Sequence, residues 1–268
     1  MITLTVLEKT CDSIIIIYYR KIYYRKKLEI FMRTDDFYLL FQPIVNVETS
    51  NTKVAKVDEY EVLLRSYKSD TFPSDEFHFI LSHEEYYIIF MNWFSEKLEE
   101  KLNQHPEIVV SVNFDLDQFQ YIGTIQFLER FNSYSENILI EMTEHFPTRN
   151  PELLDSLHDI LKKIKQYHYK IVIDDFTEGI NTYFLYKKYR SYYNRIKITY
   201  RNNVLSWLNI VFLAYYVRLI NKIYSKEISI VVEKIDTVNK AKWMRKFGLY
   251  RQQGYYWGKG SEKIEQLD

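Results

Sequence analysis

The chain has 268 residues, of which 47% are hydrophobic, so it can bury a large core. Such a length is ordinary for a single α/β barrel, which needs about 250 residues. Lysine plus arginine and aspartate plus glutamate number 36 each, which makes the formal net charge zero. The composition therefore argues against a protein that binds polymeric nucleic acid through a general basic excess.

The only cysteine is Cys11, so an internal disulfide is excluded, and no cysteine or histidine cluster has zinc-site spacing. We expect a cytoplasmic protein without a transmembrane segment. The longest aliphatic run, Ile14 to Tyr19, is far shorter than the ~20 residues of a membrane span. Basic residues follow this run instead of preceding it, unlike in a secretory signal. A peripheral contact of Ile14 to Lys27 with an anionic membrane remains an alternative.

Residues 1–33 show no clean hydrophobic period. We interpret them as an N-terminal extension, a strand and helix packed outside the domain that residues 34–268 form. The pattern becomes regular at Phe37, and strands are predicted at Phe37–Val45 and Asp58–Arg65. The short polar loop between them permits an antiparallel pair, because a parallel pair requires a longer crossover.

Strands and helices alternate after Pro106. The further strands are predicted at Glu107–Phe114, Ile138–Met142, Lys170–Asp175, Arg195–Ile198, Ile228–Glu233 and Tyr250–Gln253. The helices are predicted at Ser74–Ser82, Glu84–Gln104, Gly123–Ser133, Pro151–Tyr167, Asn181–Arg190, Val204–Ser225 and Thr237–Phe247. Eight strands with helices between most of them predict an α/β fold, a (β/α)8 TIM-like barrel whose first strand is antiparallel to the rest. No linker and no internal repeat is found, so we expect one domain.

Two adjacent carboxylates, Asp174 and Asp175, end the predicted strand that starts at Lys170. They repel each other unless a cation lies between them, and hard divalent cations prefer carboxylate oxygens. The structural alternative is that Asp175 is solvated and that Asp174 caps the next helix. The pair alone does not decide between these interpretations.

Other predicted strands also carry a polar residue in or at the end of the strand. These residues are Glu61, Asn113, Glu141, Lys197, Glu233 and Gln253. In a barrel such positions converge on one rim, where barrel enzymes have their active sites. Converging carboxylates are repulsive without a counter-ion, and an all-oxygen set with one amide suits Mg²⁺ or Mn²⁺ better than zinc. We predict a pair of divalent ions, an arrangement that promotes attack of water on a phosphodiester.

Taken singly, these residues also have structural interpretations. Glu61 would be an ion-pair partner of Arg65, and Asn113 would be a turn residue. Lys197 would be a solvated side chain and Gln253 a loop residue. Their joint placement on successive strands favours the metal-site interpretation.

Eight segments resemble, in order, the motifs of the EAL-domain phosphodiesterases, which hydrolyse cyclic di-GMP. They are Phe41-Gln42-Pro43-Ile44, Glu61-Val62-Leu63-Leu64-Arg65, Val112-Asn113-Phe114, Glu141-Met142-Thr143-Glu144, Asp174-Asp175-Phe176, Ile196-Lys197-Ile198, Val232-Glu233 and Gln252-Gln253-Gly254-Tyr255-Tyr256. Val62 stands in the alanine place of the family's signature. The resemblance runs from about Phe37 to Lys259 and implies an EAL-type barrel that converts cyclic di-GMP to linear pGpG.

The resemblance also implies a role for each site residue in a two-metal mechanism with a metal-activated water. The implied ligands of the two Mg²⁺ or Mn²⁺ ions are Glu61, Asn113, Glu141, Asp174, Asp175 and Glu233, with Asp174 shared. Lys197 and Gln253 would position the water or stabilise charge, and Glu144 would steady the loop after Asp175. The implied substrate contacts are Gln42, Leu63 and Arg65.

The partners implied are cyclic di-GMP and a second copy of the chain in a homodimer. The basic, aromatic stretch Tyr186 to Arg195 leaves a contact with nucleic acid as an alternative, although such a stretch is typical of a solvated helix face.

The sequence departs from the family pattern beside the predicted site. Thr177 and Glu178 replace Gly-Thr after Phe176, and a β-branched residue resists positive φ. Thr199 replaces an aspartate. Further departures are Lys234 in place of a glycine and Gly260 in place of a proline. The alternative function is therefore a catalytically weak EAL-like module that binds cyclic di-GMP or a protein partner.

Overall fold

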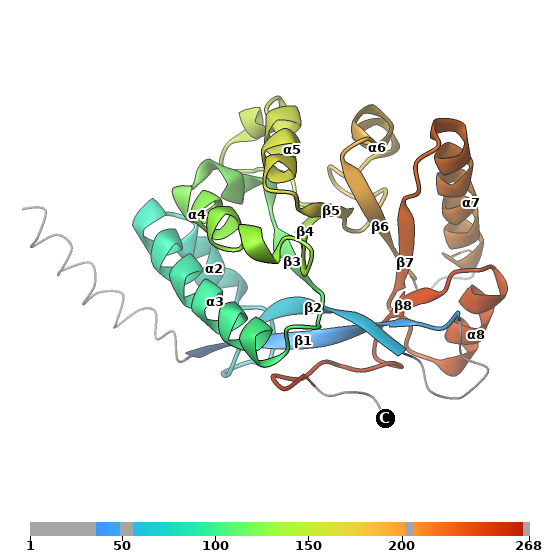
Figure 1. Cartoon of the computed structure of the whole chain (residues 1–268), viewed down its shortest axis with the longest axis horizontal. Helices are drawn as coiled ribbons and strands as arrows, with labels where there is room; N and C mark the ends of the chain where they lie inside the picture. The colour runs from blue at the N-terminus through green and yellow to red at the C-terminus, as the bar shows by residue number, and fades with distance from the viewer. Residues whose placement is uncertain (1–35, 49–55, 202–205, 265–268) are drawn as a thin grey trace, which may run out of the picture.

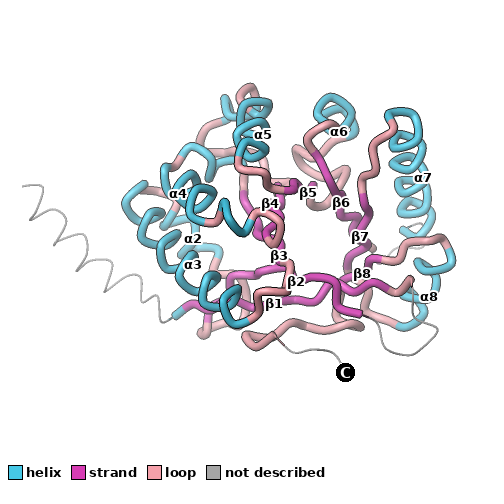
Figure 2. Tube along the Cα trace, in the orientation of Figure 1, coloured by secondary structure: helices cyan, strands magenta, loops and turns pink. Residues whose placement is uncertain are grey.

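The computed structural model describes residues 36–48, 56–201 and 206–264, so the interpretation of residues 1–33 lies outside the described part. In this part the strands close into one barrel in chain order (Figures 1 and 2). The strands are β1 Phe37–Asn46, β2 Lys56–Ser66, β3 Val110–Phe114, β4 Ile138–Met142, β5 Lys170–Ile173, β6 Tyr193–Thr199, β7 Ser229–Glu233 and β8 Arg251–Gln253. The predicted barrel is confirmed.

The first strand runs against its two neighbours, as predicted. β1 pairs antiparallel with β2 and with β8, whereas the pairs from β2 to β8 are parallel. A short connection joins β1 to β2, while each parallel pair is joined by a crossover that contains a helix. The register sets Gln42 opposite Glu61 and Asn113 opposite Glu141.

Helices cover the outside of the barrel (Figure 1). They are α2 Ser74–Ile80, α3 Glu84–Gln104, α4 Ile122–Arg130, α5 Leu157–Gln166, α6 Tyr183–Tyr189, α7 Ser206–Tyr224 and α8 Val238–Lys246, with 3-10 turns at Leu116–Gln120, Asn132–Tyr134 and Pro151–Leu154. No helix in the described ranges combines the length and the apolar character that crossing a bilayer requires.

The side chains of β2 alternate between the two faces of the strand, so that one strand contributes to both the core and the site. Tyr60, Val62 and Leu64 are buried in the main hydrophobic cluster between the barrel and its helices. Successive side chains of a strand point to opposite faces, so Glu59 and Glu61 point into the barrel. There they meet cations that come from β6.

Four predicted elements need correction. The helix predicted at Gly123–Ser133 is α4, which ends at Arg130, followed by the 3-10 turn at Asn132–Tyr134. The strand predicted at Lys170–Asp175 ends at Ile173, so both aspartates lie in the turn after it. The strand predicted at Glu107–Phe114 begins only at Val110. The helix predicted at Pro151–Tyr167 is instead a 3-10 turn followed by α5. The Asp155 N–H donates to the Glu152 carbonyl at the end of the turn, and the α-helix begins at Leu157.

Candidate active site

Lys197 lies at the centre of the candidate site. It is 1% exposed on β6, so the interpretation as a solvated side chain is wrong. Its Nζ lies 2.9 Å from Glu61 Oε2 and 2.7 Å from Glu233 Oε1, and it also donates to Glu141 Oε1. Asp174 Oδ1 is 3.5 Å away. Strands β2, β4 and β7 and the turn after β5 thus each direct a carboxylate at one ammonium group.

Burial and charge shift the protonation of this cluster. Burial raises the pKa of Glu141 and of Asp174, and it raises the pKa of Glu233 to about 7, although Lys197 acts in the opposite direction. Burial also opposes the charge of Lys197, but the surrounding carboxylates hold its pKa well above the usual range. For Glu61, Lys197 and amide donors outweigh burial and lower the pKa.

Amide side chains hold Glu61 in place. Asn113 Nδ2 donates to Glu61 Oε1 over 2.7 Å, and Gln253 Nε2 donates to Glu61 Oε2 over 2.6 Å. Gln253 also donates to Gln42 Oε1 over 3.0 Å. Asn113 and Gln253 are therefore strand residues of the site, not turn or loop residues. Glu61 does not pair with Arg65, whose guanidinium donates to the Leu64 carbonyl over 2.8 Å.

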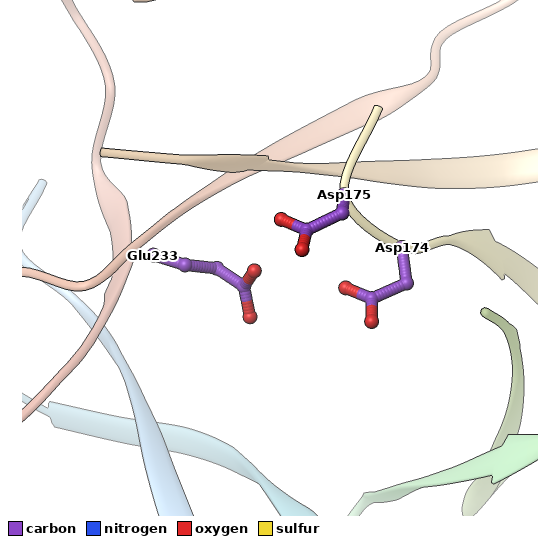
Figure 3. Close-up of side chains that lie close together, drawn as sticks. All are labelled: Asp174, Asp175 and Glu233. Carbon is purple, nitrogen blue, oxygen red and sulfur yellow. The ribbon is translucent and has the colours of Figure 1, made fainter. Parts of the chain in front are cut away.

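A second group of carboxylates lies beside Lys197. Figure 3 shows Asp174 and Asp175, from the turn after β5, and Glu233, from the end of β7, around one space. Each can place one oxygen within 4.8 Å of the others. Thr199 Oγ1 lies within hydrogen-bond distance of Asp175 Oδ1 and 3.1 Å from Glu233 Oε2. Asp174 caps no helix, since the N-cap of α6 is Thr182.

The residues present fit divalent cations. Four carboxylates contact the ammonium of Lys197, and Asp175 lies beside two of them. The five carboxylates and one ammonium leave four negative charges if all are ionised, and two divalent ions would balance them. Three buried oxygens of the cluster, on Glu141, Asp174 and Gln253, have no hydrogen-bond partner. Orphaned buried oxygens are costly, and hard cations satisfy them. The oxygens of Glu61, Asn113 and Glu141, around Lys197, form a first group of possible ligands. Asp174, Asp175 and Glu233 form the second.

The turn after β5 is conformationally unusual. Asp175, Thr177 and Gly179 have φ values of 38°, 85° and 46°. A Cβ on Gly179 would lie 1.8 Å from the Glu144 carbonyl oxygen, and that oxygen accepts the Ile180 N–H over 2.9 Å. The backbone of Glu144 therefore holds the loop, whereas its carboxylate lies 3.6 Å from a nitrogen of His145.

Glu178 does not add an unbalanced charge to the site. Its carboxylate forms an ion pair with Arg201, on the segment after β6. The Phe176 N–H donates to the Lys197 carbonyl over 2.9 Å, which also holds the loop against the barrel. The departures from the family pattern at positions 177 and 178 are thus accommodated by one strained residue and one ion pair.

A cavity of about 630 Å³ opens beside the carboxylates. It is lined by Glu61, Asn113, Asp174 and Asp175 of the candidate site, and also by Leu63, Arg65, Phe72, His78, Asp115, Glu144, His145, Phe146 and Arg149. Two of the three predicted substrate contacts, Leu63 and Arg65, thus line it. Gln42 does not, because it is buried and donates to the Gly258 carbonyl.

Sequence reasoning missed a histidine on the cavity wall. His145 Nδ1 lies 2.9 Å from Asp115 Oδ1, and Thr143 donates to the same oxygen. The hydrogen bond from His145 to Asp115 raises the pKa of the imidazole to about 9. The only signal in the sequence was the place of His145 directly after Glu144; its partner, Asp115, lies on the preceding strand connection, directly after β3.

Comparisons with known proteins bear on the family and the fold. The model of the EAL domain family matches residues 25–260. Among solved structures, the PaMucR phosphodiesterase in complex with c-di-GMP has a TM-score of 0.67 at 19% identity, over 88% of this chain and 96% of that one. Klebsiella pneumoniae BlrP1 with calcium and cy-diGMP has a TM-score of 0.67 at 19% identity, over 87% of this chain and 58% of that one.

The EAL enzyme Bd1971, in a cGMP-bound form, has a TM-score of 0.65 at 19% identity, over 90% of this chain and 67% of that one. No curated protein matches the sequence. The match of the family model over most of the chain shows that the protein belongs to the EAL domain family. At these identities the solved structures establish the barrel fold, with its antiparallel first strand.

Proposed function

We propose that the protein hydrolyses cyclic di-GMP to linear pGpG. The observation that carries the proposal is the cluster of five carboxylates with orphaned oxygens. Three of these carboxylates, on Glu61, Asp174 and Asp175, line the cavity. An enzyme seldom keeps such a costly acidic cluster without a cation. Family membership supports the same substrate, since PaMucR and BlrP1 bind this dinucleotide.

The metal ligands we propose are Glu61, Asn113, Glu141, Asp174, Asp175 and Glu233. They would hold two Mg²⁺ or Mn²⁺ ions, with Asp174 shared. When bound, divalent ions supply Lewis acidity toward a phosphodiester and its attacking water. Asn113 fixes the carboxylate of Glu61, and the Thr199 hydroxyl lies between those of Asp175 and Glu233 and donates to one of them at a time.

The chain's own groups have distinct tasks in the reaction. Arg65, on the cavity wall, binds a phosphate of the dinucleotide through paired hydrogen bonds. The free Oε1 of Gln253 accepts a hydrogen bond from the attacking water. Lys197 stays protonated and stabilises negative charge that develops on the phosphoryl group. The water oxygen bonds to phosphorus and loses a proton, the bond to the ribose 3′ oxygen breaks, and that oxygen takes up a proton, so that one water is consumed.

The decisive experiment incubates the full chain with cyclic di-GMP and measures the pGpG formed by chromatography. Product is expected with Mg²⁺ or Mn²⁺ and not with a chelator. Asp174→Asn should lower the rate by about 100-fold or more, because it removes one charge from the shared ligand. Folded protein that binds either ion but forms no pGpG contradicts the proposal.

One observation favours a second function, a weakly active module that senses cyclic di-GMP. Thr177 adopts φ 85° beside Asp175, and a strained β-branched residue there can misplace a metal ligand. Calorimetry with cyclic di-GMP separates the two functions. Tight binding without turnover assigns the protein to the sensors.

We also propose that the protein works in the cytoplasm and that two copies form a homodimer. The single cysteine fits a reducing compartment. The dimer rests on the family resemblance alone, and no surface is assigned to it. Light scattering at several protein concentrations measures the oligomeric state.

A further inference from the structure

Helices α2 and α3 carry a concentration of negative charge. Residues 74–104 include seven aspartate and glutamate residues and two lysines, which makes their formal charge −5, although the whole chain is neutral. Two of the acidic residues, Glu85 and Glu96, are exposed and form no ion pair with a described residue. This surface therefore attracts cations.

The exposed side of α3 is a stripe that combines acidic and apolar side chains. Its members are Glu85, Ile89, Trp93, Glu96 and Glu100, and their spacing puts them on one face of the helix. Ile89 is 37% exposed, and Trp93 is half-buried. The opposite side of α3 is buried in the core. We call this stripe the outer face of α3.

Residues 14–27 have the chemistry that complements the outer face of α3. They include five lysine and arginine residues and no aspartate or glutamate, and the other nine are isoleucine or tyrosine. These residues lie outside the described part of the chain. None of their charges takes part in the candidate site.

The described chain begins beside the outer face of α3. The Phe37 and Trp93 rings lie 6.3 Å apart, so β1 starts next to the middle of α3. Eight residues separate residues 14–27 from the first described residue, and such a link spans about 12 Å even at the rise of a helix. Either end of the outer face is eight residues of helix or fewer, about 12 Å at most, from Trp93. Residues 14–27 can therefore reach this face.

Charge decides between the occupants of the outer face of α3. A second copy of the same face would oppose carboxylates with carboxylates, and like charges across an interface are destabilising. Anionic lipids and nucleic acids are repelled for the same reason. A basic and apolar segment satisfies both components, because its cations pair with the three glutamates while its isoleucines and tyrosines cover Ile89 and Trp93. A segment of the same chain also has a high effective concentration at this face.

We propose that residues 14–27 bind the outer face of α3 in the same chain. The inner side of α3 lines the cavity beside the carboxylates with Phe90, Met91 and Phe94. The bound segment thus braces a helix that forms part of the cavity wall. This contact does not depend on the proposed phosphodiesterase activity.

Hydrogen exchange of the full chain, measured by mass spectrometry, tests the contact. The backbone amides of residues 14–27 are expected to exchange roughly ten-fold or more slowly than those of an unstructured chain. Glu85→Lys with Glu96→Lys should lower that protection by about three-fold or more, and so should Arg20→Glu with Lys21→Glu. The four substitutions together again oppose unlike charges and should recover most of the protection.

Glu152→Lys with Asp155→Lys is the matched control. These two acidic residues are exposed in and directly after the 3-10 turn that precedes α5, so their replacement should leave the exchange of residues 14–27 unchanged. Thermal melts check that the variants fold. Exchange at the unstructured rate, equal losses in the α3 and control variants, or no recovery in the fourfold variant each overturn the proposal.

Two further outcomes would assign residues 14–27 to another partner and overturn the contact within one chain. Protection that rises with protein concentration would place them on α3 of a second copy. Protection that appears only with vesicles of phosphatidylglycerol and phosphatidylcholine would place them on an anionic membrane. The measurement needs no turnover, so its failure is distinct from failure of the proposed activity.

Discussion

At the scale of single residues, Lys197 is both a catalytic candidate and a structural counter-ion. Among the described residues, its ammonium is the only cation that contacts a set of four buried or half-buried carboxylates, those of Glu61, Glu141, Asp174 and Glu233. Removing one partner of a buried ion pair leaves an uncompensated charge, which costs about 3–5 kcal/mol. The same carboxylates are the proposed metal ligands, so metal ions and Lys197 share one task.

Lys197→Met should therefore destabilise the protein by about 3–5 kcal/mol in a chelator, and Mn²⁺ should recover most of that loss. Urea denaturation with and without Mn²⁺ measures both quantities. Arg195→Met is the matched control, because it removes a buried cation that pairs with Glu59, outside the proposed ligands. Equal recovery of the two variants by Mn²⁺ would contradict the metal assignment.

Thr199 stands where the family pattern has an aspartate, and its hydroxyl joins two proposed ligands. Thr199→Val should weaken Mn²⁺ binding by about 10–100-fold, the usual effect of losing a hydrogen bond to a ligand. Titration calorimetry gives the affinity. Thr199→Ser keeps the hydroxyl and should bind as the unmodified protein does; a loss of equal size in both variants would refute the hydrogen-bond role.

His145 gives the protein a pH-dependent contact. Its hydrogen bond to Asp115 raises its pKa from 6.5 to about 9, so its contribution to stability is complete below pH 6.5 and is lost as the pH rises through 9. The melting temperature of His145→Gln should differ from that of the unmodified protein below pH 6.5, and the difference should shrink above pH 9. A difference that stays constant over this range would exclude the charged pair as its source.

At the scale of elements, the loop between β5 and α6 carries the strain of the site. Thr177→Gly should raise the free energy of unfolding by about 1 kcal/mol, because glycine adopts positive φ without a steric penalty. Gly179→Ala should lower it, since its Cβ would collide with the Glu144 carbonyl. Urea denaturation checks both directions, and a destabilised Thr177→Gly would show that the threonine contacts outweigh its strain.

The sequence predicted an element best where a long hydrophobic period or clear bounding turns defined it. The bounds of α3 and of β4 are as predicted, because α3 has a long helical period and β4 is a short apolar run between turns. The short turn at Leu116–Gln120 was missed, since its cap depends on Asp115 and Gln118 side chains folding back on the backbone. Strand ends were displaced by up to three residues, because side-chain patterns do not fix where ladder hydrogen bonds stop.

The site was predictable as a set of residues but not as a network. The strand positions of Glu61, Glu141 and Glu233 suffice to bring them to one rim. The central place of Lys197 and the double contact of Thr199 depend on side-chain directions across several strands, which no single segment encodes. The Asp115–His145 contact escaped notice for the same reason.

At the scale of the whole molecule, the proposed ions should act as stabilising ligands. An ion that binds only the folded chain raises its stability by about 2.7 kcal/mol at 100 times its dissociation constant. The melting temperature should rise with Mg²⁺ or Mn²⁺ concentration and fall when a chelator is added. In Asp174→Asn the rise should be much smaller, and an undiminished rise in that variant would place the ions elsewhere.

The pairing of β1 with β8 makes the site late to assemble. This contact joins Ile44 to Gln253, nearly the two ends of the described chain, and such long-range pairings form slowly. Until β8 adds to β1, the edge of β1 is open and Glu61 lacks its donor from Gln253. A nascent or partly unfolded chain therefore lacks a complete site, and recovery of activity on refolding reports closure of the barrel.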